Sequence, residues 1–252
     1  MKYRIPARAL AALIAILFAS MPTRPAAAAV DPGTVITGIK TAYDLISKYT
    51  NHQLTLEQAT AQVVAAIGAA KTEILARIDG LAAAQGKACT KSAIIAFQDI
   101  QILSQTSKEQ LAKDGLDCLT LMEAYLEEVE DKASVDKLGF ALNALGPILM
   151  MTRANAGLPQ TFAISDAIQN GNYAVIAKLL PRCQTFTLTG DSQGNFTEQN
   201  IKCTAYNGDT GWAFSWVGDP NQPQERIQAQ NKATRNTSRA VAQAVNPIVP
   251  TP

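Results

Sequence analysis

Apolar residues recur at spacings of three and four along the first half of the chain, which is the periodicity of an amphipathic helix. Two such stripes run over residues 35–49 and 59–81, on either side of a polar break at 51–53. Thr55 and Gln58 have the spacing of a capping box and predict where the second helix begins. The second stripe is long and rich in alanine, a pattern typical of coiled-coil-like packing.

Further helices are expected up to residue 157. They are a helix over about 90–103, a helix that opens at a second capping box (107–110) and reaches about residue 129, and a helix from Ser134 that Pro147 would kink. Because short connections favour antiparallel neighbours, residues 30–157 are predicted to form an antiparallel bundle of about five helices.

A helical hairpin is expected next, from two short helices over 162–169 and 173–180. The run Asn170-Gly171-Asn172 between them is rich in turn formers and indicates the connection.

From Cys183 the period changes from helical to two, which predicts strands. Three strands are expected over about 183–189, 196–206 and 212–217, separated by turn-forming runs. Residues 158–218 are therefore predicted to combine the helical hairpin with a disulfide-stapled β-meander. The predicted fold is mainly α with a small three-stranded antiparallel β-sheet, α+β by content.

The register of the first strand pair follows from its cysteines. Cys183 and Cys203 lie equally far from Gln193, so a hairpin centred there places them opposite each other and predicts a cross-strand disulfide. The same register predicts one face that carries Leu188 and five aromatic side chains, Phe186, Tyr206, Trp212, Phe214 and Trp216. The opposite face would carry the disulfide with Thr185, Thr187, Ala205, Ala213 and Ser215.

The aromatic side of this sheet is expected to pack against helices, as such faces do in small domains. If it were exposed instead, Tyr206, Trp212 and Trp216 would form a stacking platform for sugars or a partner protein. The remaining residues, 219–252, are polar and amide-rich and are expected to be a partly helical or disordered tail with a loose end.

The N-terminus has the three-part layout of a secretory signal peptide. A basic region over residues 1–8 precedes an apolar run over 9–19, and Ala27-Ala28-Ala29 provides a small-residue cleavage site. The apolar run is shorter than the roughly 20 residues that span a bilayer, which makes a retained anchor the weaker interpretation. Residues 1–29 are therefore predicted to be removed after Ala29, with the mature protein secreted or periplasmic.

Export changes the interpretation of the cysteines. All four lie after residue 29, and an even number in an oxidising compartment favours two disulfides. Cys89 and Cys118 flank a predicted turn near their midpoint, so antiparallel helices would bring them to similar heights. A metal site is the weaker alternative, because there is no C-x-x-C and His52 is the only histidine.

The net charge and the sequence motifs argue against nucleic-acid binding and against a serine acylase. Removing Lys2, Arg4, Arg8 and Arg24 with the leader leaves 18 basic against 21 acidic residues, so no basic footprint indicates nucleic acid. The pattern S-x-x-K occurs at Ser134–Lys137 without the partner motifs of serine acylases, and a helix cap explains it better. No cofactor is indicated. A pair of carboxylates acting as acid and base would leave no local motif and stays open.

One apolar segment has two interpretations. Residues 138–151 contain Asn143 as their one polar side chain, and their leucines are Leu138, Leu142, Leu145 and Leu149. A buried central helix is the default, but a very apolar segment inside a secreted helical bundle is also the layout of α-helical pore-forming toxins.

The sequence favours a secreted, non-catalytic binding or interaction protein that acts at the cell surface or on an extracellular partner. The alternatives are a membrane-active, pore-forming protein of helical type and a cell-envelope hydrolase. The partner would be a protein or a cell surface, with no nucleic acid, and membrane contact belongs to the first alternative.

Overall fold

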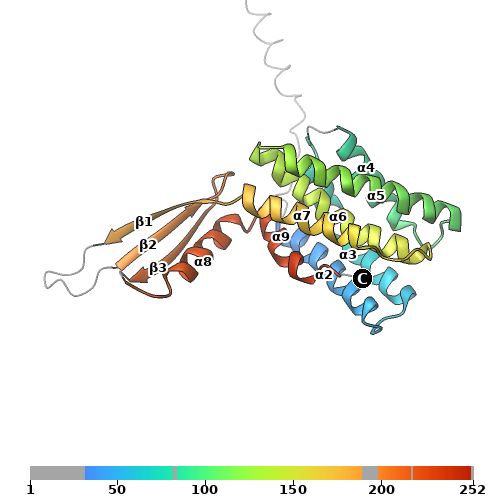
Figure 1. Ribbon diagram of the computed structural model, residues 1–252, viewed down its shortest axis with the longest axis horizontal. Helices are drawn as coiled ribbons and strands as arrows, with labels where there is room; N and C mark the ends of the chain where they lie inside the picture. Colours follow the sequence, from blue (N-terminus) through green and yellow to red (C-terminus); the bar gives the residue numbers. More distant parts are fainter. Residues whose placement is uncertain (1–31, 82–83, 189–197, 217, 251–252) are drawn as a thin grey trace, which may run out of the picture. The chain divides into compact units, whose positions relative to one another are not determined.

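The computed structural model describes residues 32–81, 84–188, 198–216 and 218–250. The predicted signal peptide and the turn around Gln193 lie outside these residues. Within them the predicted fold class is confirmed: the chain is mainly α, with one three-stranded antiparallel sheet (Figure 1).

The first part of the chain forms successive helices that pack against their neighbours in sequence. They are α2 (Pro32–Thr50), α3 (Leu56–Ile78), α4 (Ala84–Gln98), α5 (Gln105–Glu128), α6 (Lys132–Asn155) and α7 (Phe162–Lys178). The capping box at the start of α3 is confirmed, with the Thr55 hydroxyl and the Gln58 side chain each accepting the other residue's amide N–H. The predicted box at 107–110 is wrong, because the Ser104 hydroxyl caps the helix three residues earlier, accepting from the Ser107 N–H.

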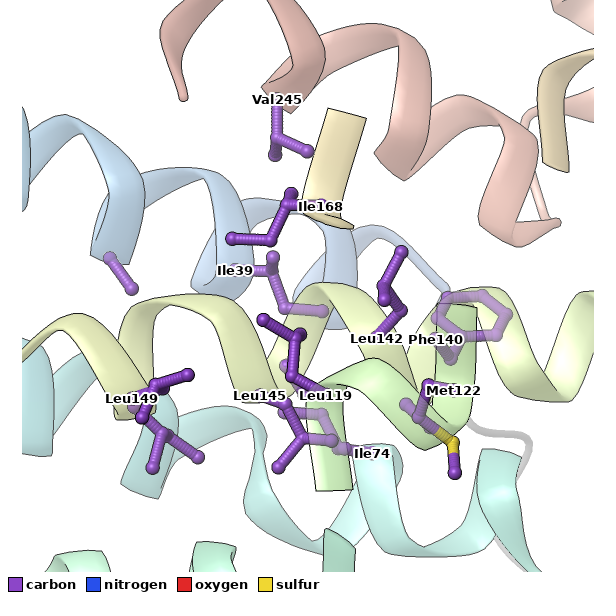
Figure 2. Close-up of a cluster of buried hydrophobic side chains, with 14 of the residues drawn as sticks. Ile39, Ile74, Leu119, Met122, Phe140, Leu142, Leu145, Leu149, Ile168 and Val245 are labelled. Carbon is purple, nitrogen blue, oxygen red and sulfur yellow. The ribbon is translucent and has the colours of Figure 1, made fainter. Parts of the chain in front are cut away.

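Helix α6 is the centre of the core. It contacts α2, α3, α4, α5, α7 and α9 (Ser238–Val245), and every residue from Leu138 to Thr152 is buried. Figure 2 shows its Leu142, Leu145 and Leu149 among side chains from the surrounding helices. A helix that is apolar on all sides is stable in water only when neighbours cover all of it, as here.

The predicted helical hairpin is wrong, because residues 162–178 form the single helix α7. The turn-forming residues serve helix packing instead. Asn172 is fully buried, and its side-chain oxygen accepts a hydrogen bond of 2.8 Å from the Asn143 amide of α6. A Cβ built on Gly171 would lie only 2.5 Å from a methyl carbon of Leu142, so α6 and α7 approach closely there.

The sheet has the order β1 (Arg182–Leu188), β2 (Glu198–Thr204) and β3 (Thr210–Trp216), with both pairs antiparallel. Cys183 pairs with Cys203, as the sequence predicted, and Cys203 pairs with Gly211 on the next strand. This register places Phe186, Trp212, Phe214 and Trp216 on one face of the sheet and the disulfide on the other.

The expectation that the aromatic side packs against helices is wrong. Helix α8 (Gln222–Thr234) covers β2 and β3 on the opposite, disulfide-bearing side instead (Figure 1). Helix α8 packs on this side because the residues at the contact are small. A Cβ built on Gly211 would overlap the backbone of Ala229 and Ala233, so α8 lies directly against the sheet. A helix can approach this closely only over a face without bulky side chains.

Of the two alternatives for residues 219–252, the structure shows the helical one, and the expectation of a loose end is wrong. After α8 the chain forms α9 and a 3-10 turn (Asn246–Ile248), and Val241, Ala242 and Val245 of α9 are fully buried in the core. The Ser165 hydroxyl donates a hydrogen bond of 2.6 Å to the Pro250 carbonyl, so the order continues to the last described residue. The weak apolar stripe of this region arises because α8 makes its contacts through alanines.

Candidate functional site on the aromatic face

Four large aromatic side chains lie on the uncovered face of the sheet. Phe186 is 44% exposed, Trp212 43%, Phe214 65% and Trp216 55%. The rings of Phe186 and Trp212 lie 6.5 Å apart with a tilt of 30°, within the range of favourable ring pairs. We call these four residues the aromatic face. Isolated exposed apolar residues are ordinary, whereas a group of large exposed rings on one sheet face is uncommon.

The central strand of the same side is polar. In β2 the side chains that share this side are Glu198, Asn200, Lys202 and Thr204. Asn200 lies between Phe186 and Phe214 in the register. We call these four residues the polar row. It runs between aromatic side chains of the two outer strands.

Two members of the polar row have notable contacts. The Lys202 ammonium lies 5.2 Å from the centre of the Trp212 ring, a cation–π distance. The side-chain oxygen of Asn200 is buried and has no hydrogen-bond partner among the described residues. The row therefore holds a positive charge and an unused acceptor beside apolar rings.

A cavity of about 350 Å³ adjoins the end of the sheet at which β1 begins. Lys132, Leu180, Arg182, Thr204, Ala205 and Tyr206 line it. The Lys132 ammonium donates a hydrogen bond of 3.4 Å to the Leu180 carbonyl. The Arg182 side chain is exposed and forms no ion pair within the described ranges. We call this cavity the basic cavity, because both of its charged side chains are cations.

Tyr206 belongs to the wall of this cavity and not to the open face. It is 37% exposed, and its hydroxyl donates a hydrogen bond of 2.8 Å to the Asp136 carboxylate of α6. The same carboxylate accepts a hydrogen bond of 2.5 Å from the Ser238 amide. Burial raises the pKa of the Asp136 carboxyl, although these donors and the nearby Arg77 guanidinium act in the opposite direction. Burial also raises the pKa of the Tyr206 phenol, and the Asp136 charge raises it further.

Both predicted disulfides are confirmed. Cys89 of α4 and Cys118 of α5 are bonded with their Cα atoms 5.9 Å apart, and Cys183 and Cys203 with theirs 4.0 Å apart. The second bond joins β1 to β2 beside the basic cavity. It therefore restrains the strands that carry Phe186 and the polar row.

The S-x-x-K match at Ser134–Lys137 lies in the first turns of α6. The Ser134 amide donates to the Asp131 side chain at the start of α6, and the Lys137 ammonium donates a hydrogen bond of 3.0 Å to the Gly80 carbonyl. The Ser134 amide thus takes part in the N-cap of α6, and the Lys137 ammonium binds the residue after the C-cap of α3. In the part of the chain that the structure describes, no group of three His, Cys, Asp or Glu side chains could hold a metal ion.

The apolar segment of α6 lies inside the bundle. Leu138, Leu142, Leu145 and Leu149 are each at most 1% exposed. Among the described helices, none has the length and hydropathy of a membrane span. Contact of these leucines with a membrane would require α6 to leave the core, and the membrane-active alternative stays a prediction.

The charged part of this site was not predicted from the sequence. Arg182 and Lys202 alternate in phase with the aromatic residues, so the register alone could have placed them on the same side. No sequence signal brings Lys132 or Asp136 to the sheet, because both come from α6 through tertiary contact.

No protein family model, no curated protein and no solved structure matches this chain.

Proposed function

We propose that this protein is a secreted, non-catalytic binding protein that holds its partner on the aromatic face. The observation that carries the proposal is that Phe186, Trp212, Phe214 and Trp216 are between 43% and 65% exposed although a helix covers the other side of the same sheet. Burial of apolar area stabilises by about 25 cal/mol per Å², so covering these rings would contribute strongly to a complex.

Rigidity of the sheet supports the same proposal. The Cys183–Cys203 bond joins β1 to β2, and α8 packs along β3 from behind. A surface held in its binding conformation loses less entropy when a ligand binds. Two disulfides are also compatible with an oxidising, extracellular location.

Export is tested by expressing the full chain in a secreting host and determining the N-terminal residue of the exported protein. We expect Val30, since cleavage is predicted after Ala29. An exported or membrane-bound protein that still begins at Met1 would contradict this part of the proposal.

Binding is tested with the oxidised protein from Val30 onward, incubated with isolated cell envelopes of the source organism and then sedimented. The face variant Trp212→Ala, Trp216→Ala is compared with the control variant Thr185→Ala, Thr187→Ala, whose residues are exposed on the other side of β1. Circular dichroism and disulfide content first establish that each variant folds.

We expect the parent and the control variant to sediment with the envelopes and the face variant to bind at least tenfold more weakly. The proposal would be overturned if the face variant bound as tightly as the control variant, or if the parent did not bind.

A further inference from the structure

The dimensions of the aromatic face and polar row favour a narrow, chain-like ligand. Each strand has seven residues, and at roughly 3.3 Å per residue and about 4.8 Å between strands the side measures roughly 23 Å by 14 Å. That area, on the order of 300 Å², is less than half of the roughly 800 Å² that each partner buries in a stable protein–protein interface. A second copy of the chain or another globular protein would need additional surface.

This side of the sheet is amphipathic, because polar side chains lie between aromatic ones. Aromatic rings flank a row of amide, ammonium, hydroxyl and carboxylate groups. A sugar ring has a matching arrangement, with apolar C–H faces and a rim of hydroxyl groups. A lipid chain would bury the Lys202 ammonium without hydrogen-bond partners, which is costly. An extended peptide binds a sheet mainly through backbone groups at an edge strand and not across the side chains of one face.

The charges are distributed unevenly along this side. Lys202 and Arg182 lie towards the basic cavity, where Lys132 adds a third cation, whereas Glu198 lies at the opposite end of the polar row. Two carboxylates act on Tyr206 in the wall of this cavity. Asp136 is buried and accepts hydrogen bonds from Tyr206 and Ser238, and Asp131 accepts one from the Ser134 amide. Among the described residues, neither carboxylate forms an ion pair with Arg182 or Lys132. The cations at this end are therefore available to an external anion. A nucleic acid would instead need cations along its whole path.

We infer that the aromatic face and the polar row bind a short segment of an acidic polysaccharide, with a sugar carboxylate held at the basic cavity by Arg182 and Lys132. This inference rests on the proposed function and names its ligand class. The planar guanidinium of Arg182 suits a carboxylate because it can donate two parallel hydrogen bonds. Sugar rings further along the chain would stack on the aromatic face.

The two tryptophans of the whole chain, Trp212 and Trp216, both lie on the aromatic face, so tryptophan emission excited at a wavelength that tyrosine does not absorb reports on this surface. The experiment titrates the oxidised protein with tetra- to hexasaccharides of galacturonate, mannuronate and hyaluronan. Cello- and chito-oligosaccharides of the same length are the neutral probes, and an oligothymidylate of eight nucleotides is the nucleic-acid probe.

We expect at least one acidic oligosaccharide to shift the emission and to bind about tenfold more tightly than its neutral match. Arg182→Gln should remove that preference, and rising salt should reduce it, since the contact is ionic and partly exposed. The matched control is Arg226→Gln, an exposed arginine whose guanidinium lies 3.5 Å from the Thr185 hydroxyl on the other side of the sheet. This control variant should still bind the acidic oligosaccharide more tightly than the neutral one.

Equal binding of acidic and neutral sugars, or a response to the oligothymidylate alone, would overturn the inference. If no sugar binds while envelope binding still depends on Trp212 and Trp216, the inference fails and the proposed function stands. If the parent protein also does not bind the envelopes, both the inference and the proposed function are wrong.

Discussion

The Tyr206 hydroxyl donates a hydrogen bond of 2.8 Å to the Asp136 carboxylate, which lies 70 residues earlier in the chain. Asp136 belongs to α6 at the centre of the core, and Tyr206 lies between β2 and β3. The Ser238 amide at the start of α9 donates to the same carboxylate. One buried side chain thus joins the helical core, the sheet and the C-terminal helix, and it lies behind the wall of the basic cavity.

Tyr206→Phe should lower the free energy of unfolding by about 1–3 kcal/mol, because it removes a hydrogen bond and leaves a buried carboxylate with one donor fewer. Urea denaturation measures the change. Tyr173→Phe is the control, since Tyr173 is 60% exposed and should change stability little. Equal effects of the two substitutions would show that the hydrogen bond contributes nothing.

The pH dependence of stability should carry the signature of Asp136. Its pKa is raised in the folded protein, chiefly by burial. The folded state therefore binds the proton more tightly than the unfolded state. This contribution is present below the unfolded pKa of about 3.9 and is lost as pH rises through the folded pKa.

Asp136→Asn removes this titration. We expect the unfolding free energy of the parent, minus that of the variant, to fall as pH rises from about 3.9 and then to level off. The lowered pKa values of Asp79 and Asp131 act in both proteins and cancel in the difference. A difference that rises with pH would contradict the direction of the Asp136 shift.

Gly211→Ala should loosen α8 from the sheet. A Cβ at this position would overlap the α8 backbone at Ala229 and Ala233, and overpacking of this kind costs about 1–3 kcal/mol. Limited proteolysis should then cleave within residues 222–234 more rapidly than in the parent. Thr210→Ala, at the exposed neighbouring position of β3, should leave the cleavage rate unchanged.

The two disulfides should have separable roles. Closing loops of 29 and 20 residues corresponds to about 3–4 kcal/mol each in the chain-entropy description. Cys183→Ala, Cys203→Ala should weaken ligand binding as well as stability, because it releases β1 from β2. Cys89→Ala, Cys118→Ala should lower stability and leave the affinity of the folded protein unchanged. Denaturation and the fluorescence titration distinguish these outcomes, and a reversed pattern would contradict them.

Local patterns predicted much of the helical part. The capping box of Thr55 and Gln58 marks the start of α3 in the sequence and in the structure. The prediction failed at Asn170–Asn172, where residues that usually form turns are instead used for close packing of α7 on α6. Such a use depends on a partner helix that local sequence does not describe.

The local sequence pattern is sufficient to predict which strand residues share a side of the sheet. Alternation and the position of Cys183 and Cys203 about Gln193 specify the register, and the register assigns the side chains within the strands to one side. Tyr206 lies beyond the end of β2, and its predicted place on the aromatic side was wrong. Which side is covered depends on long-range packing that the local pattern does not contain. That choice depends on α8, which contacts the sheet through alanines opposite Gly211 and therefore carries little hydrophobic signal of its own. The aromatic face is exposed because the closest packing was available on the other side.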